Sequence, residues 1–283
     1  MTTNHVRSAS LPTATRSLIM SAEEQLQRLK SSAGTSTSSN STICRKLDGL
    51  KKLYDCVDDV LKLPISQQIH EKHAKLLEQV SDVSLNVLDT CSIIKDAFSQ
   101  MKGSVQLLES SLRRGIVGES NLSTQVDAYM ASNKQLNKVI CKRLRDLKQK
   151  GNTQTIIIED SEFASLISLI KGVDDISITV LESTLSFISH PKMRSKASSW
   201  SLIPKILKPK RVSCEGIDIS EVEKIVMELL LLQNEKIDQS QMLSDLKKLQ
   251  VFESSIQEIE EGLGVMFRLL LKNRVSLLNI LSH

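Results

Sequence analysis

The sequence predicts an all-α protein, folded as an elongated antiparallel bundle of long helices. Apolar residues recur three and four positions apart through most of the 283-residue chain, which is the pattern of helices that each bury one face. The chain holds only 10 glycines and 5 prolines, fewer than turn-rich β architectures usually contain. Aromatic residues make up 3% of the chain, so leucine, isoleucine and valine are expected to fill the core.

The first two long helices are expected at residues 43–63 and 66–113. Pro64 ends the first, because proline disfavours helix in the residue before it, and Ser66 can cap the second. The second helix is expected to bend near Gly103 and carries the longest apolar stripe of the chain. The members of that stripe are Val80, Val83, Val87, Cys91, Ile94, Phe98, Met101, Val105, Leu108 and Leu112.

Three further helical segments complete the predicted bundle. Residues 121–150 and 161–189 each carry an apolar stripe and end at helix-breaking residues. From about residue 219 to the end, the pattern supports one long helix, or two with a break near Gly262 and Gly264. A two-stranded coiled coil would show stricter seven-residue spacing, so we favour an antiparallel bundle.

The predicted domain organisation is one bundle with a disordered N-terminal arm. Residues 1–42 are expected to be largely disordered, with one short helix at about 21–31 and a linker rich in serine and threonine after it. Residues 43–283 are expected to form a single helical-bundle domain. A flexible basic linker at residues 191–216 interrupts this domain.

Cysteine usage and hydropathy predict an intracellular protein, with a cytoplasmic location preferred. The five cysteines are odd in number, widely spaced and without a CxxC pair, which is typical of reduced thiols. No apolar run approaches the ~18 residues of a membrane span. The acid-free start up to Glu23 suits an organellar transit peptide or a plain disordered tail, and we prefer the tail. Plastid, nucleus and peripheral membrane remain open.

Two histidines and two acidic pairs are the candidate ligands for a metal ion. His70 and His73 flank Glu71 in HEKH, which is not the HExxH of zinc proteases. The side chains of Asp58-Asp59 and Asp174-Asp175 diverge by about 100° on a helix, so each pair is expected to be a solvated face. Glycine-rich phosphate loops and nucleophile elbows are missing from the sequence. We predict no catalytic residue, no cofactor, no metal and no enzymatic activity.

The basic linker is the best candidate for a functional segment. Its cations alternate with apolar residues and Trp200, which suits an anionic membrane surface, a nuclear import signal at residues 208–211, or a solubilising connector, the interpretation we favour. Ser213 follows basic residues and is a candidate phosphosite. The candidate contacts to an anionic surface are Lys192, Arg194, Lys196, Trp200, Lys205, Lys208, Lys210 and Arg211.

The C-terminal segment, VMFRLLLKNRVSLLNILSH, is strongly apolar with three cations interspersed. Such a segment can lie on a membrane surface. More often it is a bundle helix that is buried on two sides, and we favour this second interpretation.

Four stretches carry a resemblance to a known family. They are HVRSASLP at residues 5–12, EEQLQRLKSS at 23–32, CRKLDGLKKLYDCVDDVLKLP at 44–64 and the segment from Phe252 to His283. Together they resemble the plant family of unknown function 241, which is related to the BYPASS-like (BPS-type) developmental proteins. The resemblance implies an all-helical plant protein, linked to root and shoot development, with no catalytic residue to carry over. In the BYPASS-like relatives the role concerns restraint of a mobile root-derived signal.

The expected function is therefore that of a non-enzymatic plant helical-bundle protein. It acts in root and shoot development through protein–protein interaction, as the resemblance implies, and its protein partners are not identified by the sequence. The alternative is a peripheral membrane protein that binds anionic lipid through the basic linker at 192–211. A net charge of +4 is mild, so no nucleic-acid partner is expected.

Overall fold

A computed structural model describes residues 13–33, 39–63, 70–116, 122–149, 161–188, 224–226 and 239–282 of the chain. These residues are almost entirely helical and contain no strand, which confirms the predicted all-α class. The long helices are α1 (Thr13–Ala33), α2 (Asn40–Leu61), α4 (His70–Ile116), α5 (Leu122–Gln149), α6 (Ser161–Ile188) and α8 (Gln239–Ser282).

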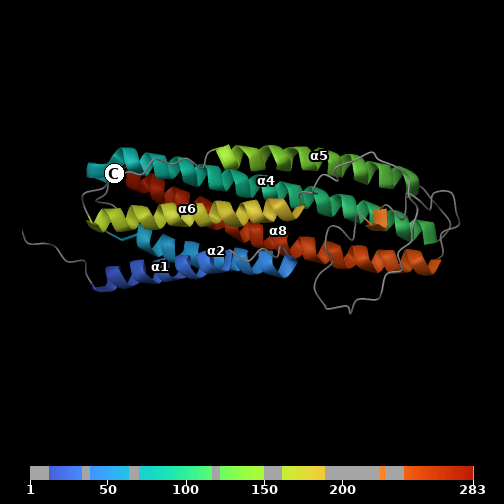
Figure 1. Cartoon of the computed structure of the whole chain (residues 1–283), viewed down its shortest axis with the longest axis horizontal. Coiled ribbons are helices and arrows are strands. Elements are labelled where there is room, and N and C mark those ends of the chain that lie inside the picture. The colour runs from blue at the N-terminus through green and yellow to red at the C-terminus, as the bar shows by residue number, and fades with distance from the viewer. Residues whose placement is uncertain are drawn as a thin grey trace, which may run out of the picture.

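α4 and α8 form the central pair of the bundle and run its full length (Figure 1). With 47 and 44 residues, each is about 70 Å long. α2 and α6 pack on the half of this pair that holds the C-terminus of α8, and α1 packs on α2 and α6 (Figure 1). α5 lies along α4 toward the other end (Figure 1). α2 lies between α1 and α8. The result is an elongated bundle.

Polar contacts between α4 and α8 show that the two helices are antiparallel. Residue numbers rise along α4 as those of their partners fall along α8. The contacts join Ser81 to Arg274, Cys91 to Leu263, Lys102 to Gln257, and Gln106 to Glu253.

The core contains the apolar stripes that the sequence predicts. Every member of the stripe between residues 80 and 112 is buried except Val83, which is half-buried. Phe98 and Phe252 are the largest fully buried side chains, and aliphatic residues fill most of the remaining core. Period-3.6 spacing therefore identifies the inward faces of the helices correctly.

The observed helices lie close to the predicted ones, with three differences in their bounds. α2 begins at Asn40, so residues 40–42 of the expected disordered arm are helical. α1 begins at Thr13, well before the expected start at about residue 21, because Thr15 and Ile19 are buried along with the later apolar residues of the helix. α4 continues through Gly103 without interruption. Residues 1–12 and 34–38, part of the expected disordered arm, lie outside the described ranges.

α8 is one helix across Gly262 and Gly264, so the one-helix alternative holds for residues 239–282. Gly262 permits a close approach of α2, since a Cβ atom there would meet Leu47 Cδ1 at 3.2 Å. The preceding part of the expected helix, residues 219–238, is described only at 224–226, which are helical.

Candidate functional site

The segment that the sequence favours as a site is not among the described residues. The whole linker at 191–216, with its cations from Lys192 to Arg211, Trp200 and the candidate phosphosite Ser213, lies outside them. His70 and His73 belong to the first turn of α4, but their side chains also lie outside the description. The roles assigned to these residues therefore stay predictions.

Within the described ranges, no three histidine, cysteine, aspartate or glutamate side chains gather as metal ligands would. Four cysteines in this part of the chain, Cys44, Cys56, Cys91 and Cys141, are free thiols. None of the helices that the structure describes is both long and apolar enough to cross a bilayer.

The prediction of solvated faces at the two acidic pairs is wrong for one member of each pair. Asp58 on α2 and Asp174 on α6 are buried, with 2% and 3% of their surface exposed. Asp59 and Asp175 are exposed, so the expected divergence within each pair is observed. The error arises because neighbouring helices cover the face on which Asp58 and Asp174 lie.

A buried polar cluster joins α2, α6 and α8. The Tyr54 hydroxyl lies 3.0 Å from Ser177 Oγ, which itself donates to the Val173 carbonyl at 2.7 Å; the tyrosine is therefore the donor to Ser177. Asn273 Nδ2 donates to the Tyr54 carbonyl at 3.4 Å. The sequence singles out neither Ser177 nor Asn273, because polar residues within an apolar stripe give no distinct signal of burial.

Asp174 lies beside this cluster in an environment that disfavours its charge. Burial raises the pKa of Asp174 well above its ordinary value, and the charge of Asp175 raises it further. Burial likewise raises the pKa of the Tyr54 hydroxyl, and Asp174 adds to that shift. Within the described part of the chain, Asp174 Oδ2 and Asn273 Oδ1 have no hydrogen-bond partner. Both environments favour the neutral forms, so this cluster acts as a set of neutral hydrogen-bonding groups.

Asp58, one turn after Tyr54, is instead held as a carboxylate. Burial opposes its charge, but ion pairs with Lys272 of α8, at 2.8 Å, and with Lys62 of its own helix outweigh the burial and lower the pKa of Asp58. The ion pair between Asp58 and Lys272 joins α2 to α8 within one helical turn of the hydrogen bond between Tyr54 and Asn273. The polar residues thus set the relative position of three helices.

A second set of polar contacts joins α5 to α4. The Arg143 guanidinium donates to both the carbonyl and the side-chain oxygen of Asn86, at 2.8 Å each, and to Thr90 Oγ1 at 3.1 Å. A guanidinium that bonds three acceptors on one helix fixes both register and orientation.

An aliphatic face on the C-terminal half of α8 is exposed. We define the α8 face as Leu271, Val275 and Leu278, which are 47%, 50% and 41% exposed. Their spacing of four and three places them on one side of the helix. α8 otherwise packs against α4 and α2, as expected of a helix buried on two sides, and the α8 face is a third side.

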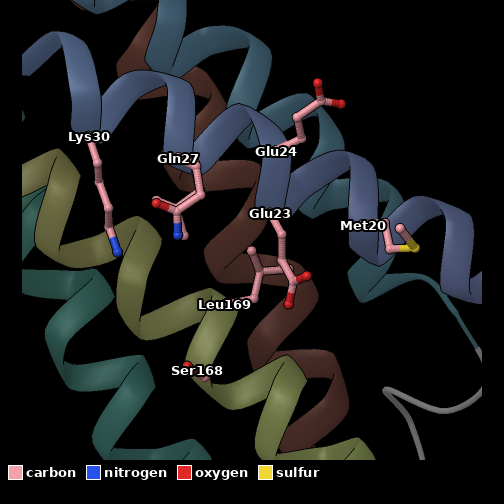
Figure 2. Close-up of a pocket in the computed structure, with 8 residues that line it drawn as sticks. Met20, Glu23, Glu24, Gln27, Lys30, Ser168 and Leu169 are labelled. Atoms are coloured by element: carbon pink, nitrogen blue, oxygen red, sulfur yellow. The ribbon is translucent and has the colours of Figure 1, made fainter.

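A shallow, open depression of about 570 Å³ lies between α1 and α6 (Figure 2). Acidic Glu23 and Glu24, basic Lys30 and apolar Met20 line it from α1, while Ser168 and Leu169 line it from α6. The lining mixes charges of both signs on an open wall. It offers no enclosed chamber that would exclude water from a reaction.

Comparison with known proteins identifies the family of this chain. The family model described as Protein BPS1 matches residues 46–280, from the first turns of α2 nearly to the end of α8. No curated protein and no solved structure matches the chain. The match covers most of the chain and confirms the resemblance to the BYPASS-like proteins. Because the match extends over most of the chain, the chain belongs to the BPS1 family of plant proteins.

Proposed function

We propose that this protein is a non-enzymatic component of plant root and shoot development that binds a partner protein through the α8 face. Membership of the BPS1 family suggests a developmental role. The observation that carries the mechanism is the exposure of three aliphatic residues, Leu271, Val275 and Leu278, on one side of the C-terminal half of α8. The face suits an amphipathic helix of a partner protein.

The spacing of the α8 face supports a helical partner. Aliphatic residues at i, i+4 and i+7 are the anchors by which one helix packs against another. Contiguous apolar surface on a folded protein commonly marks a binding site. Leu85 of α4, one turn after the Ser81 that Arg274 of α8 contacts, is also exposed, at 37%.

The charges around the α8 face favour a protein over an anionic lipid surface. Arg268 is exposed one turn before Leu271 and suits an acidic side chain on the partner. On the α2 side, however, Asp58 binds Lys272 and raises the pKa of that lysine, and Asp55 and Asp59 add to the shift. This edge therefore carries both signs of charge, and a partner helix that also carries both signs can match it, whereas an anionic membrane surface would pair only with the cations.

The test is a comparison of three full-length variants expressed in plant tissue. The first, L271Q/V275Q/L278Q, makes the α8 face polar. The second, L107Q/V139Q, changes exposed aliphatic residues on α4 and α5 and is the matched control. The third, K205A/K208A/K210A/R211A, neutralises the basic linker. Circular dichroism first establishes that each variant is folded.

We expect the α8-face variant to lose specific protein partners and to fail to support normal root and shoot growth, while the other two retain both. A recovered partner should bind the purified protein directly through a helical segment, and the same α8 substitutions should abolish that binding. Unchanged partners in the α8-face variant would refute the proposal. The membrane alternative would instead be established by two results together. The protein would sediment with anionic vesicles only when the linker cations are present, and the α8-face variant would keep its function.

A further inference from the structure

α6 is attached to the bundle by contacts separate from those that hold α8 in place. It packs against α1, α2, α4 and α5, whereas α8 packs against α4 and α2 (Figure 1). The inward side of α6 is mostly apolar, and Asp174 lies near its middle with 3% of its surface exposed. A buried carboxyl group thus lies on the side by which α6 is held, and α6 can separate from α2 while the contacts of α8 persist.

The hydrogen-bond donors of the polar cluster around Asp174 are already in use. The Tyr54 hydroxyl donates to Ser177 Oγ at 3.0 Å, and the Ser177 hydroxyl donates to the Val173 carbonyl at 2.7 Å. The side-chain amide of Asn273 donates to two backbone carbonyls, at 3.4 and 3.0 Å. Within the described residues, Asp174 Oδ2 has no partner. A carboxylate can only accept hydrogen bonds, so this cluster suits the neutral acid and leaves the ionised form unsatisfied.

The charges on and around α6 do not compensate for this lack of donors. Lys30 of α1 lies against α6 two residues earlier, and Lys148 of α5 acts on Glu182 instead. The charge that acts on Asp174 is that of Asp175, which has the same sign, and together with burial it raises the pKa of Asp174. No cation of the described ranges forms an ion pair with Asp174. The other titratable groups near the cluster are Tyr54 and Asp58 of α2, Cys91 and Lys95 of α4, and Lys272 of α8, which binds Asp58.

We propose that α6 is a pH-sensitive switch, which packs against α2 while Asp174 carries a proton and separates from the bundle when Asp174 ionises. Separation brings water to the carboxylate. It also exposes the apolar side of α6 and the surfaces of α2 and α4 that α6 covers. The exposure of this apolar surface therefore increases as the surrounding pH rises. The switch does not depend on the α8 face, and either one can fail without the other.

The direction and steepness of the response follow from proton linkage. The closed form binds a proton that the open form releases above the ordinary aspartate pKa of about 4. The closed form is therefore fully favoured below that value, and its advantage is lost as the pH rises toward the pKa of Asp174 in the closed form. One proton per opening event corresponds to an opening constant that increases up to about ten-fold per pH unit in this window.

Hydrogen exchange of the full-length protein between about pH 5 and pH 8, corrected for the intrinsic exchange rate, tests the proposal. In the wild type, we expect the opening constant of the α6 amides to rise by up to about ten-fold per pH unit, while the central amides of α4 and α8 stay protected. Asp174→Asn, which keeps the shape of the neutral acid, should remove this dependence. Asp175→Asn should move the rise to lower pH, because the charge of Asp175 favours the proton on Asp174.

Glu182 provides the matched control. It lies on the same helix, and burial also raises its pKa, but Glu182→Gln should leave the pH response of α6 unchanged. The proposal is overturned if E182Q removes the response, if D174N retains it, or if α6 exchanges only when α4 and α8 do. Should D174N not fold, a carboxyl-carbon NMR titration of the wild type decides the question. One aspartic acid should remain neutral near pH 7, and ionisation of every aspartate at that pH would overturn the proposal.

Discussion

Asp58 and Asp174 are both buried carboxyl groups on packed helices, yet their surroundings shift their pKa values in opposite directions. Burial raises the pKa of Asp174, and the charge of Asp175 raises it further. Asp58 is also penalised by burial, but Lys272 and Lys62 stabilise its charge more, so its pKa is lowered. The difference follows from whether a cation reaches the carboxylate.

Asp174→Asn should stabilise the protein increasingly as the pH rises. Because the pKa of Asp174 is raised by folding, its contribution to stability is fully present below the unfolded value and is lost as the pH rises toward the folded value. A tenfold change in the proton affinity of the carboxyl group on folding is worth about 1.4 kcal/mol. We therefore expect D174N to exceed the wild type by about 1 kcal/mol or more at pH 7.5, with little such gain at pH 4. Urea unfolding at both pH values measures this, and a pH-independent difference would contradict it.

Asp58→Asn should have the opposite dependence on pH. The lowered pKa of Asp58 contributes stability above the unfolded value, and this is lost as the pH falls through the folded value. Removing the carboxylate breaks both ion pairs, but the two lysines are more than half exposed and stay solvated. We therefore expect a loss of about 1 kcal/mol at pH 7 that shrinks in acid. The exposed neighbour provides the control, since Asp59→Asn should change unfolding free energy by less than about 0.5 kcal/mol. Equal effects at the two positions would be inconsistent with the observed burial.

The sequence identifies most buried apolar residues but not the buried acids. Spacing alone places Asp174 in phase with Ile170, Ser177 and Leu181, so its position on the core face of α6 is a signal that the sequence contains. A solvated Asp174 is nevertheless the usual expectation from sequence, because acidic residues are seldom buried. Whether a lysine of α8 reaches Asp58 depends on the tertiary arrangement of two helices and is not a property of local sequence.

At the scale of elements, packing overrides local helix breakers. Gly103, Gly262 and Gly264 all lie inside continuous helices, although each suggests a bend or a break in the sequence. Glycine weakens an isolated helix by about 1 kcal/mol relative to alanine, which is less than the burial of a long apolar stripe contributes. The ends of α5 and α6 are predictable, since breakers there coincide with the end of the stripe.

Gly103→Ala should stabilise the protein by about 0.5–1 kcal/mol, because it gains helix propensity and a Cβ atom at this position has no neighbour within 4 Å. Gly172→Ala is the matched comparison. Its Cβ atom would meet Leu26 at 2.8 Å, so its gain should be smaller or absent. Thermal and urea unfolding measure both, and a destabilised G103A would indicate a conformational need for glycine there.

Arg143→Ala should weaken the packing of α5 on α4 more than the substitution of any neighbouring charged residue of α5. It leaves the carbonyl of Asn86 and the hydroxyl of Thr90 without this donor, and we expect a loss of about 2 kcal/mol. Arg145 is the control, since its side chain bonds to the Cys141 carbonyl within α5 and its replacement by alanine should cost less than about 0.5 kcal/mol. Hydrogen exchange should show the lost protection on α5 first, and uniform loss over all helices would contradict this assignment.

At the scale of the whole molecule, α4 and α8 are the central helices on which the other helices of the bundle are assembled. α2 packs on α8, α6 packs on α4, and α5 packs mainly on α4, while α1 is attached through α2 and α6. The integrity of the α4–α8 pair should therefore determine global unfolding. Cys91 of α4 lies at its centre, where its thiol donates to the Leu263 carbonyl of α8 at 3.7 Å. Burial raises the pKa of Cys91 to about 12.

Thiol alkylation should therefore distinguish surface from core. Cys141 is exposed and should react readily with iodoacetamide in the folded protein. Cys91 should react only at the rate at which α4 and α8 separate, because both access and the thiolate are suppressed. Peptide mass spectrometry over time measures each site, with urea-unfolded protein as the control, and rapid labelling of Cys91 in the native state would exclude a tightly packed central pair.

The bundle class is predictable from the sequence because apolar periodicity reports directly on helix faces. The α8 face is not, since Leu271, Val275 and Leu278 belong to a segment that is apolar on nearly all sides, and only the positions of α2 and α4 decide which side stays uncovered. The length of α1 escapes prediction for a similar reason, because Thr15 and Ile19 become buried only when α2 and α6 are present.

α2 contacts α1 through Gly49 on one side and α8 through Tyr54 and Asp58 on the other. The packing of α1 and the polar contacts of α8 therefore both depend on the position of this one helix. A substitution at Asp58 that loosens α2 should expose the amides of α1 to hydrogen exchange as well as those of α2.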